Sequence, residues 1–185
     1  MRPLVFTIGS SNASWAAFTN HLDQFGIQIV ADVRSFPRSR IPAFNQVALG
    51  RGLNERGIGY HHFGRQLGGY VTDRSVSYAH RVTESAFLDG IEEVLELARQ
   101  SRVALLCAEG EPLDCHRALV IARYLVEAGL ADVTHIHKDG RLETHAELAD
   151  RMMRRVGVHT DLFADRAELL SAAYSKRLFR MGLRP

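Results

Sequence analysis

The two cysteines of the chain lie in one short stretch that also carries an acid and an imidazole. The stretch reads CAEGEPLDCHR (107–117), with Glu109 and His116 beside the two thiols. A thiol at the start of a helix has a lowered pKa, because unpaired amide N–H groups and the helix dipole favour its anionic form. With Asp114 predicted as the N-cap, Cys115 is the candidate thiolate, and Glu109 and His116 are the candidate proton-transfer groups.

Three kinds of chemistry fit these residues. A nucleophilic thiol needs a lowered pKa and a nearby base, and His116 or Glu109 would supply the base. A metal site needs three or four ligands, which the two cysteines, His116 and a histidine at position 61 or 62 would provide, although the spacing is not that of a zinc knuckle. A redox pair of Cys107 and Cys115 is the third. The sequence leaves the three open, and we assign no metal ligands from it.

A second group of charged residues follows a predicted strand, in the stretch ADVRSFPRSR. Asp32 ends the strand and Arg34 follows two residues later, so both side chains are expected to face the same side. We expect Arg34, Arg38 and the more distant Arg117 to bind a phosphate or carboxylate group of a ligand. Asp32 would orient the guanidinium of Arg34. The alternative is an internal Asp32–Arg34 pair that only braces the loop.

Four further residues complete the candidate substrate-binding set. Ser11 and Asn12 follow the first predicted strand in a GSSN loop, whose backbone amides would cradle an anion. The dinucleotide-binding glycine pattern is absent there, so we expect no NAD site. Asn45 begins a weakly helical stretch, and His62 lies in a short predicted strand, where the alternation of side chains sends either it or His61 inward.

These residues share a place in the expected fold. Apolar runs at 4–8, 27–33, 58–63, 102–108 and 133–137 predict strands, and amphipathic stretches between them predict helices. This alternation is typical of an α/β fold with a Rossmann-like, mostly parallel sheet of about five strands, flanked by helices. Ligands bind beyond the carboxyl ends of such strands, which is where the candidate residues fall.

Two helices are expected to close the chain. Thr144 and Glu147 form a predicted capping box for the first of them, and Asp161 is expected to open the second. We therefore expect a single domain over residues 1–185, with a sheet core (1–140) and a C-terminal helical extension (141–185).

Composition narrows the class of protein. The chain has 185 residues, 46% hydrophobic and 24% charged, with a formal net charge of +2. That charge argues against tight, sequence-independent binding of long duplexes. Arginine supplies nearly all the positive charge, which fits anionic partners or a GC-rich genome. The N-terminal apolar run of about five residues is too short for a signal peptide or a membrane span, and two cysteines give no disulfide framework, so we expect a cytoplasmic protein that does not bind membranes.

Four motifs and a tail occur in a recognisable order: FTIGSSN, VADVRSFPRSRIPAFN, ALGRGLNERGIGYHHFGRQLGG, LLCAEGEPLDCHRALVIARYL, and HIHKDGRLETHAEL followed by DLF. Together they resemble the proteins of the domain of unknown function 488 family. The resemblance implies a Rossmann-like fold and a site at these motifs, but no reaction, because the family has no established general activity. The chain departs from the family pattern at two places. In the first motif a histidine commonly follows the glycine, whereas this chain has Ser10. In the third motif the family usually has an acidic residue before Leu-Gly-Gly, whereas this chain has the sequence QLGG.

The leading expectation is an enzyme that acts on a phosphate-bearing substrate, a nucleotide or a nucleic acid. Its arginines would bind the anion, and Cys115 would be the nucleophile or activated thiol. The alternative is a non-catalytic nucleotide or nucleic-acid binding module, in which Phe36, Phe44 and Tyr70 stack bases. A metal-binding variant of the same site is a further alternative. The substrate, the cofactor and the oligomeric state stay open.

Overall fold

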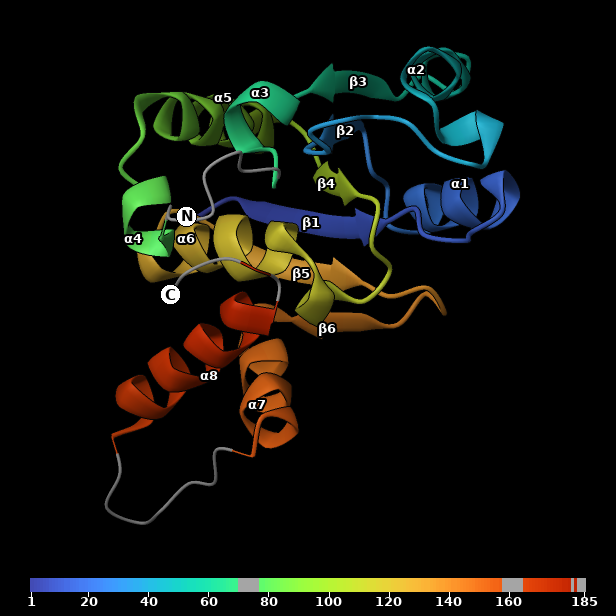
Figure 1. Cartoon of the computed structure of the whole chain (residues 1–185). Helices are drawn as coiled ribbons and strands as arrows, with labels where there is room; N and C mark the ends of the chain where they lie inside the picture. Colours follow the sequence, from blue (N-terminus) through green and yellow to red (C-terminus); the bar gives the residue numbers. More distant parts are fainter. Residues whose placement is uncertain (70–76, 158–164, 181, 183–185) are drawn as a thin grey trace.

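The computed structural model describes residues 1–69, 77–157, 165–180 and 182. Within these ranges six strands form one sheet in the order β3-β2-β4-β1-β5-β6, and Figure 1 shows helices packed around it. The strands are β1 (Leu4–Gly9), β2 (Ile29–Asp32), β3 (Gly59–His62), β4 (Val103–Cys107), β5 (Asp132–Ile136) and β6 (Leu142–Thr144). The first five are parallel and β6 is antiparallel to β5. The predicted α/β fold and its five parallel strands are confirmed.

The sixth strand was not expected from the sequence. Its three residues lie inside the segment predicted as a helical extension, so the sheet continues to Thr144. The strand forms because the turn at Asp139 and Gly140 reverses the chain and lets Leu142 pair with Ile136. The assignment of the whole chain to one domain stays a prediction.

Helices cover both faces of the sheet. They are α1 (Trp15–Gln24), α2 (Gln46–Asn54), α3 (Gly64–Leu67), α4 (Tyr78–Arg81), α5 (Ser85–Gln100), α6 (Arg123–Glu127), α7 (His145–Arg155) and α8 (Arg166–Arg180). Short 3-10 turns lie at Pro42–Phe44 and Pro112–Asp114, and residues Arg117–Ala122 form a π-helical segment that leads into α6. Figure 1 shows α7 and α8 together beyond the β6 edge of the sheet.

Alternation along the strands divides the apolar residues into two cores. One side of the central strands carries Val5 and Leu105, which pack with α5, the π-helical segment, α6, α7 and α8. The other side carries Phe6 and Leu106, which pack with α1 and α2. Because successive strand residues point to opposite faces, β4 contributes to both cores and all five of its residues are buried.

The predicted helix boundaries hold where local capping decides them. Ser14 caps α1 by accepting from the N–H of Ala17, and Thr144 and Glu147 form the predicted capping box of α7. The second C-terminal helix is present as α8, but Asp161, its expected start, lies outside the described residues.

The prediction that Asp114 is a helix N-cap is wrong. Asp114 ends a 3-10 turn, and its carboxylate pairs with Arg177 of α8. Cys115 has extended dihedral angles, φ −137° and ψ 138°, and its carbonyl accepts from the N–H groups of Ala118 and Leu119. The following helix therefore begins at His116, and Cys115 occupies the capping position instead of the first turn.

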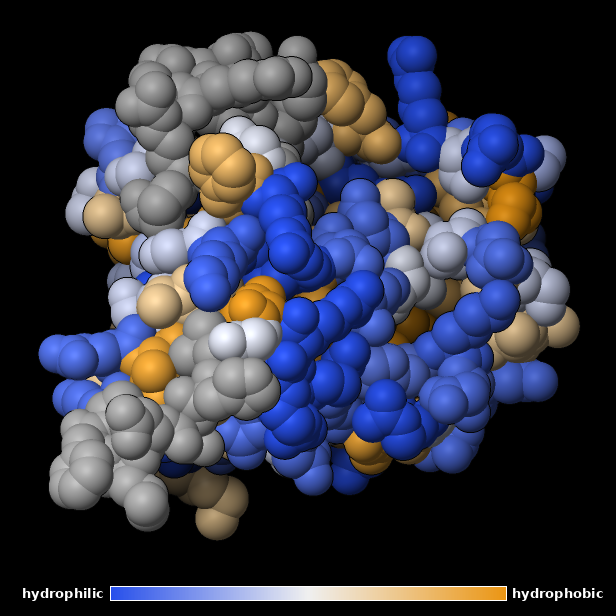
Figure 2. Space-filling model, turned by 60° about the horizontal axis from the view of Figure 1, so that its bottom comes forward, coloured by the Kyte–Doolittle hydropathy of each residue, from blue (hydrophilic) through white to orange (hydrophobic). Residues whose placement is uncertain are grey.

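In the described part of the chain, no helix has both the length and the apolar character needed to cross a membrane. The face seen in Figure 2 is mainly hydrophilic, and its apolar residues gather only in small, separate patches among the described residues.

Candidate functional site

Four side chains meet just beyond the carboxyl end of β4. Cys107 Sγ lies 2.8 Å from Glu109 Oε2 and 3.5 Å from His116 Nδ1. Cys115 Sγ lies 3.2 Å from the same oxygen and 4.0 Å from the same nitrogen. These four atoms all lie within 4.8 Å of one another. We call Cys107, Glu109, Cys115 and His116 the cysteine cluster; three of its members were predicted as catalytic residues.

The loop after β4 can approach β1 closely because residue 9 is glycine. A Cβ on Gly9 would lie 2.0 Å from the carbonyl oxygen of Glu109, which no side chain permits. The N–H of Ser10 donates to the Cys107 carbonyl at 2.9 Å, and its hydroxyl donates to the same oxygen at 3.3 Å. The buried Ser10 thus supports the strand end that carries Cys107.

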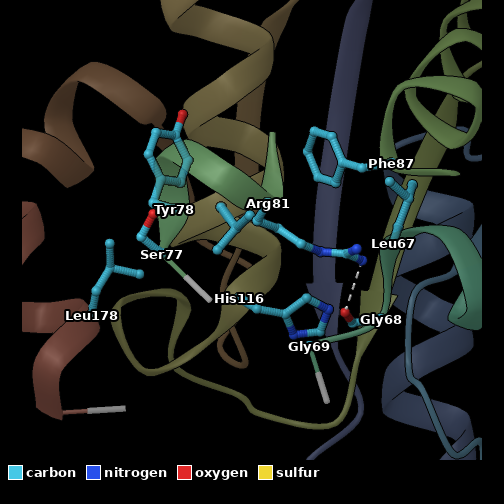
Figure 3. A pocket seen from close by; sticks show the side chains of 10 residues that line it. Leu67, Gly68, Gly69, Ser77, Tyr78, Arg81, Phe87, His116 and Leu178 are labelled. Carbon is cyan, nitrogen blue, oxygen red and sulfur yellow. Dashed lines mark hydrogen bonds between the residues drawn. The ribbon is translucent and has the colours of Figure 1, made fainter. Parts of the chain in front are cut away.

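Two backbone features fix the ring of His116. Its Nε2 lies 3.1 Å from the carbonyl oxygen of Val33, which only accepts, so Nε2 carries a hydrogen, and in the neutral ring Nδ1 presents its lone pair to the two sulfur atoms. On the other side the ring packs on Gly69, where a Cβ would lie 2.5 Å from Cγ and Nδ1. Figure 3 shows His116 beside Gly69, at the edge of a small apolar cavity that Leu67 and Phe87 also line.

An open pocket gives access to the cluster. Its volume is about 310 Å³, and Cys107, Glu109 and His116 line it. The rest of its wall is Arg34, Ser35, Phe36, Gly69 and Ala108. Glu109 is the exposed member of the cluster, whereas the other three members are buried and Cys115 is completely so. Any ligand in the pocket would therefore meet Glu109 before Cys115.

The close approach of these groups shifts their pKa values. The hydrogen bond with Cys115 and burial together raise the pKa of Cys107 well above its usual value. Burial alone would raise the pKa of Cys115, but Cys107, the charge of Arg117 and His116 together lower it well below the usual range. Burial and the nearby Cys115 raise the pKa of Glu109. The two thiols therefore titrate as a coupled pair, with the pKa of Cys115 lowered and that of Cys107 raised.

The pKa of His116 moves in the opposite direction to that expected from burial. Burial disfavours the imidazolium, but the hydrogen bond and charge of Cys115, with Glu109, raise the pKa above the usual value. The proton-transfer role expected of His116 stays a prediction.

Arg117 supports the loop after β4 from inside the protein and does not line the pocket. Its side chain is completely buried. Its guanidinium donates to the carbonyl oxygens of Glu109, at 2.5 Å, and Gly110, at 3.1 Å, and to the hydroxyl of Thr7 at 3.3 Å. Its backbone N–H donates to Cys115 Sγ at 3.4 Å. Arg117 begins the π-helical segment, a type of turn frequent at functional sites.

Asp32 and Arg34 form an internal, bidentate ion pair. Nε of Arg34 donates to Oδ1 at 2.8 Å and Nη2 donates to Oδ2 at 2.6 Å, while Nη1 donates to the carbonyl of Phe44. Tyr60 donates its hydroxyl to Asp32 Oδ2. Asp32 and Arg34 are 0% and 3% exposed, so the geometry is that of the bracing pair, and only an edge of Arg34 borders the pocket.

Other predicted substrate-binding residues lie apart from the cluster. Asn45 accepts the N–H of Ser39 at 2.8 Å, and His62 Nε2 lies 2.9 Å from the carbonyl of Arg34, so both brace the loop after β2. Ser11 and Asn12 are exposed and line a different hollow of about 240 Å³.

The charged and aromatic residues of the same loop differ in exposure. Arg38, Arg40 and Phe36 are exposed, whereas Phe44 is buried in the core. Phe44 therefore offers no face for a base to stack on. Tyr70, the third aromatic residue considered for stacking, lies outside the described residues.

Sequence reasoning undervalued two residues. Cys107 was not predicted as a catalytic residue, yet its sulfur touches both Glu109 and His116 and lines the pocket. Gly69 was not singled out, although it sets the place of the His116 ring. The signal for Cys107 was its spacing of two from Glu109 at a strand end, and the signal for Gly69 was the Gly-Gly pair after a helix.

Comparison with known proteins bears on the family alone. Neither a curated protein nor a solved structure matches the chain. A family model, described as Domain of unknown function DUF488, matches residues 14–125. This span covers more than half of the chain and contains the whole cysteine cluster and the loop after β2. The chain therefore belongs to the DUF488 family of domains of unknown function.

Proposed function

We propose that the protein is an enzyme that acts on a small phosphate-bearing molecule, with Glu109 as its general acid and base. The observation that supports this most directly is the exposed Glu109 carboxylate, which lies at an open pocket within 3.2 Å of two buried sulfur atoms. A carboxylate with a perturbed pKa at a cleft is a candidate catalytic group.

The topology of the sheet supports a ligand site at this place. The neighbours of β4 are β1 and β2, and both lead to helices of the α1 and α2 face. The β4 strand leads instead to the π-helical segment and α6, on the opposite face. In open α/β sheets the crevice beyond such a reversal is where ligands bind.

The rim of the pocket supports the choice of a nucleotide as substrate. Phe36 is 64% exposed on this rim, and a flat aromatic ring is a surface on which bases stack. Arg38 and Arg40, exposed on the same loop, carry the guanidinium groups that recognise phosphate. The buried Arg34 and Arg117 position the two loops that form the pocket.

The burial of Cys115 limits its role. A completely buried sulfur does not attack a substrate directly, so the nucleophile predicted for Cys115 is not part of this proposal. Cys115, behind the pocket wall, and His116, in the wall, instead set the electrostatic environment of Glu109. Two free thiols at a working site fit a reducing compartment, which is why we place the protein in the cytoplasm.

The test is turnover of defined nucleotides. The full chain is incubated with nucleoside mono-, di- and triphosphates, and conversion is followed by chromatography and mass spectrometry. In Glu109→Gln the rate should fall by about 10²–10⁴-fold, the usual contribution of a general acid and base. Glu92→Gln, an exposed carboxylate on α5, is the matched control and should keep the wild-type rate.

A nucleotide that binds without conversion would contradict the enzymatic proposal. If its affinity is the same in the wild type and in Glu109→Gln, the protein is a non-catalytic binding module. In that case affinity should fall in Phe36→Ala and decrease steeply with added salt.

A further inference from the structure

The cysteine cluster contains three buried atoms of the kinds that bind zinc. A zinc ion bonds to sulfur at about 2.3 Å and to imidazole nitrogen at about 2.0–2.1 Å, so tetrahedral ligands of these kinds lie roughly 3.6 Å apart. His116 Nδ1 lies 3.5 Å from Cys107 Sγ and 4.0 Å from Cys115 Sγ. Both sulfur-to-nitrogen separations are therefore within about half an ångström of the separation that the ion requires, and the two sulfur atoms lie within 4.8 Å of each other.

The tautomer of His116 suits a metal ligand. A ligand histidine usually donates its second ring N–H to a carbonyl or carboxylate, which fixes the ring and directs the free lone pair at the ion. The Val33 carbonyl has this position at Nε2, 3.1 Å away, and Nδ1 faces the two sulfur atoms. Gly69 keeps the ring in place from the other side.

The charges at the cluster also balance around a divalent ion. Arg117 is completely buried, and the hydrogen bonds described for its guanidinium go to uncharged oxygen atoms. A buried guanidinium needs a nearby negative charge. Two thiolates would neutralise a divalent cation, so the loaded site would add no further positive charge beside Arg117.

From these contacts we propose that the protein binds one zinc ion through Cys107, Cys115 and His116. Two thiolates and an imidazole favour zinc over magnesium or calcium, which prefer oxygen ligands. Three protein ligands leave a fourth coordination position, as catalytic zinc sites do. The exposed Glu109, whose Oε2 lies 2.8 Å and 3.2 Å from the two sulfur atoms, would stand beside that position, and the 310 Å³ pocket borders the cluster.

Zinc binding goes beyond the proposed function, because it can be measured without any substrate. The place of Glu109 beside the fourth position rests on the proposed function. There a carboxylate accepts a proton from water and returns it to a leaving group, which is the role of a glutamate next to zinc in hydrolytic sites.

The experiment starts from the wild-type chain under reducing conditions, stripped of metal with a chelator. After incubation with Zn²⁺ and desalting, elemental analysis should find one zinc per chain. Titration with Co²⁺ should produce an absorption band for charge transfer from thiolate to cobalt. Failure to retain zinc, or a cobalt complex without this band, would overturn the proposal even if every variant failed to fold.

Variants then test the ligand set. Zinc affinity should fall by more than about 100-fold in Cys107→Ser, Cys115→Ser and His116→Gln, beyond the 10–100-fold cost of losing an outer partner. His61→Gln, an exposed histidine on β3, is the control and should bind like the wild type. Wild-type affinity in either serine variant would overturn the assignment of ligands.

Glu109→Gln separates the two proposals. It should still bind one zinc, with an affinity within about tenfold of the wild type, while nucleotide turnover is lost. One zinc per chain without turnover of any nucleotide would contradict only the proposed function. Turnover by a chain that holds no zinc would overturn only the zinc site.

Discussion

Two buried polar groups lie side by side at the carboxyl ends of β2 and β4, and they are organised in opposite ways. In the Asp32–Arg34 pair each guanidinium nitrogen donates to an oxygen at 2.6–2.8 Å. In the cysteine cluster one carboxylate oxygen faces two sulfur atoms, and the thiols and the imidazole compete for protons. In the pair every hydrogen-bonding group has a partner, and the pair braces a loop. In the cluster several groups compete for protons, and one side of the cluster borders a pocket.

The difference separates stability from function. A buried ion pair with every partner in place resists change, because removing one member leaves a buried charge. A cluster of groups with competing protonation is unfavourable by itself, and such clusters collect at functional sites. Breaking the pair should therefore strongly destabilise the protein, and changing the exposed acid of the cluster should not.

The largest effect is expected from Asp32→Asn. Its replacement leaves Arg34, 3% exposed, without its carboxylate, at a cost of about 3–5 kcal/mol in the free energy of unfolding. Urea denaturation measures this loss. Asp23→Asn, which breaks an exposed pair with Arg56, is the control and should cost at most about 1 kcal/mol. A loss below about 1 kcal/mol for Asp32→Asn would show that the pair is not a brace.

A second closed network should make stability depend on pH. His145 Nε2 lies 2.8 Å from the Tyr174 hydroxyl, and its Nδ1 lies 3.1 Å from His135 Nε2. Burial first, and then the charge of Arg123, lowers the pKa of His145 to about 4, against the opposing effect of Glu143. His145 is buried, so the neutral form belongs to the folded state.

The sign of the pH effect follows from the lowered pKa. As pH falls from about 6.5 to 4, His145 becomes protonated in the unfolded chain but stays neutral in the folded protein. The free energy of unfolding therefore decreases over this pH range. The loss should be about 3 kcal/mol, from roughly 1.4 kcal/mol for each pKa unit. Unfolding in urea at a series of pH values measures it, and His145→Gln should make the curve less steep, while His135, whose pKa is also lowered by burial, keeps part of the slope. An unchanged slope in His145→Gln would contradict the assignment, and His61→Gln is the exposed control.

A smaller effect is expected from Gly69→Ala. The added carbon would lie 2.5 Å from the His116 ring, so the ring or the loop must shift, at a cost of about 1–3 kcal/mol in unfolding free energy. Zinc affinity should fall together with stability. Gly59→Ala, where the new carbon meets Ile29 at an ordinary 3.4 Å, should change neither. Wild-type zinc affinity in Gly69→Ala would show that the ring does not depend on this contact.

The smallest change in stability should come from Glu109→Gln. The carboxylate is exposed and crowded against two sulfur atoms, so its loss should alter the free energy of unfolding by no more than about 1 kcal/mol. Urea denaturation checks this beside the turnover assay. A loss as large as that of Asp32→Asn would mean that the cluster, like the pair, serves the fold.

The fold could be predicted from the sequence where the pattern is local. Ser14 and the Thr144–Glu147 box cap their helices through contacts three residues away, so the sequence contains both partners. The prediction of Asp114 as a helix N-cap was wrong because its partner is distant in the sequence. Its carboxylate is taken by Arg177 of α8, which is 63 residues away along the chain.

The position of the candidate site in the fold was predictable, but the contacts of its side chains were not. The end of β4 follows from strand–helix alternation, and Glu109, Cys115 and His116 follow from their closeness in sequence. Whether an arginine faces a pocket or a carbonyl was not predictable. Arg34 and Arg117 have the residue type of anion ligands, yet tertiary contacts bury both.

The sequence by itself determined the alternation of strands and helices, the family, and the presence of two thiols, an acid and an imidazole beyond one strand end. Periodicity and capping depend on neighbours within a few residues, so the chain carries this information locally. Only the tertiary structure decided that Cys107 joins the cluster, that Val33 and Gly69 orient His116, and that Asp32 closes Arg34 off. These outcomes depend on contacts across the sheet, where burial and the competition for hydrogen bonds choose among the partners that the sequence offers.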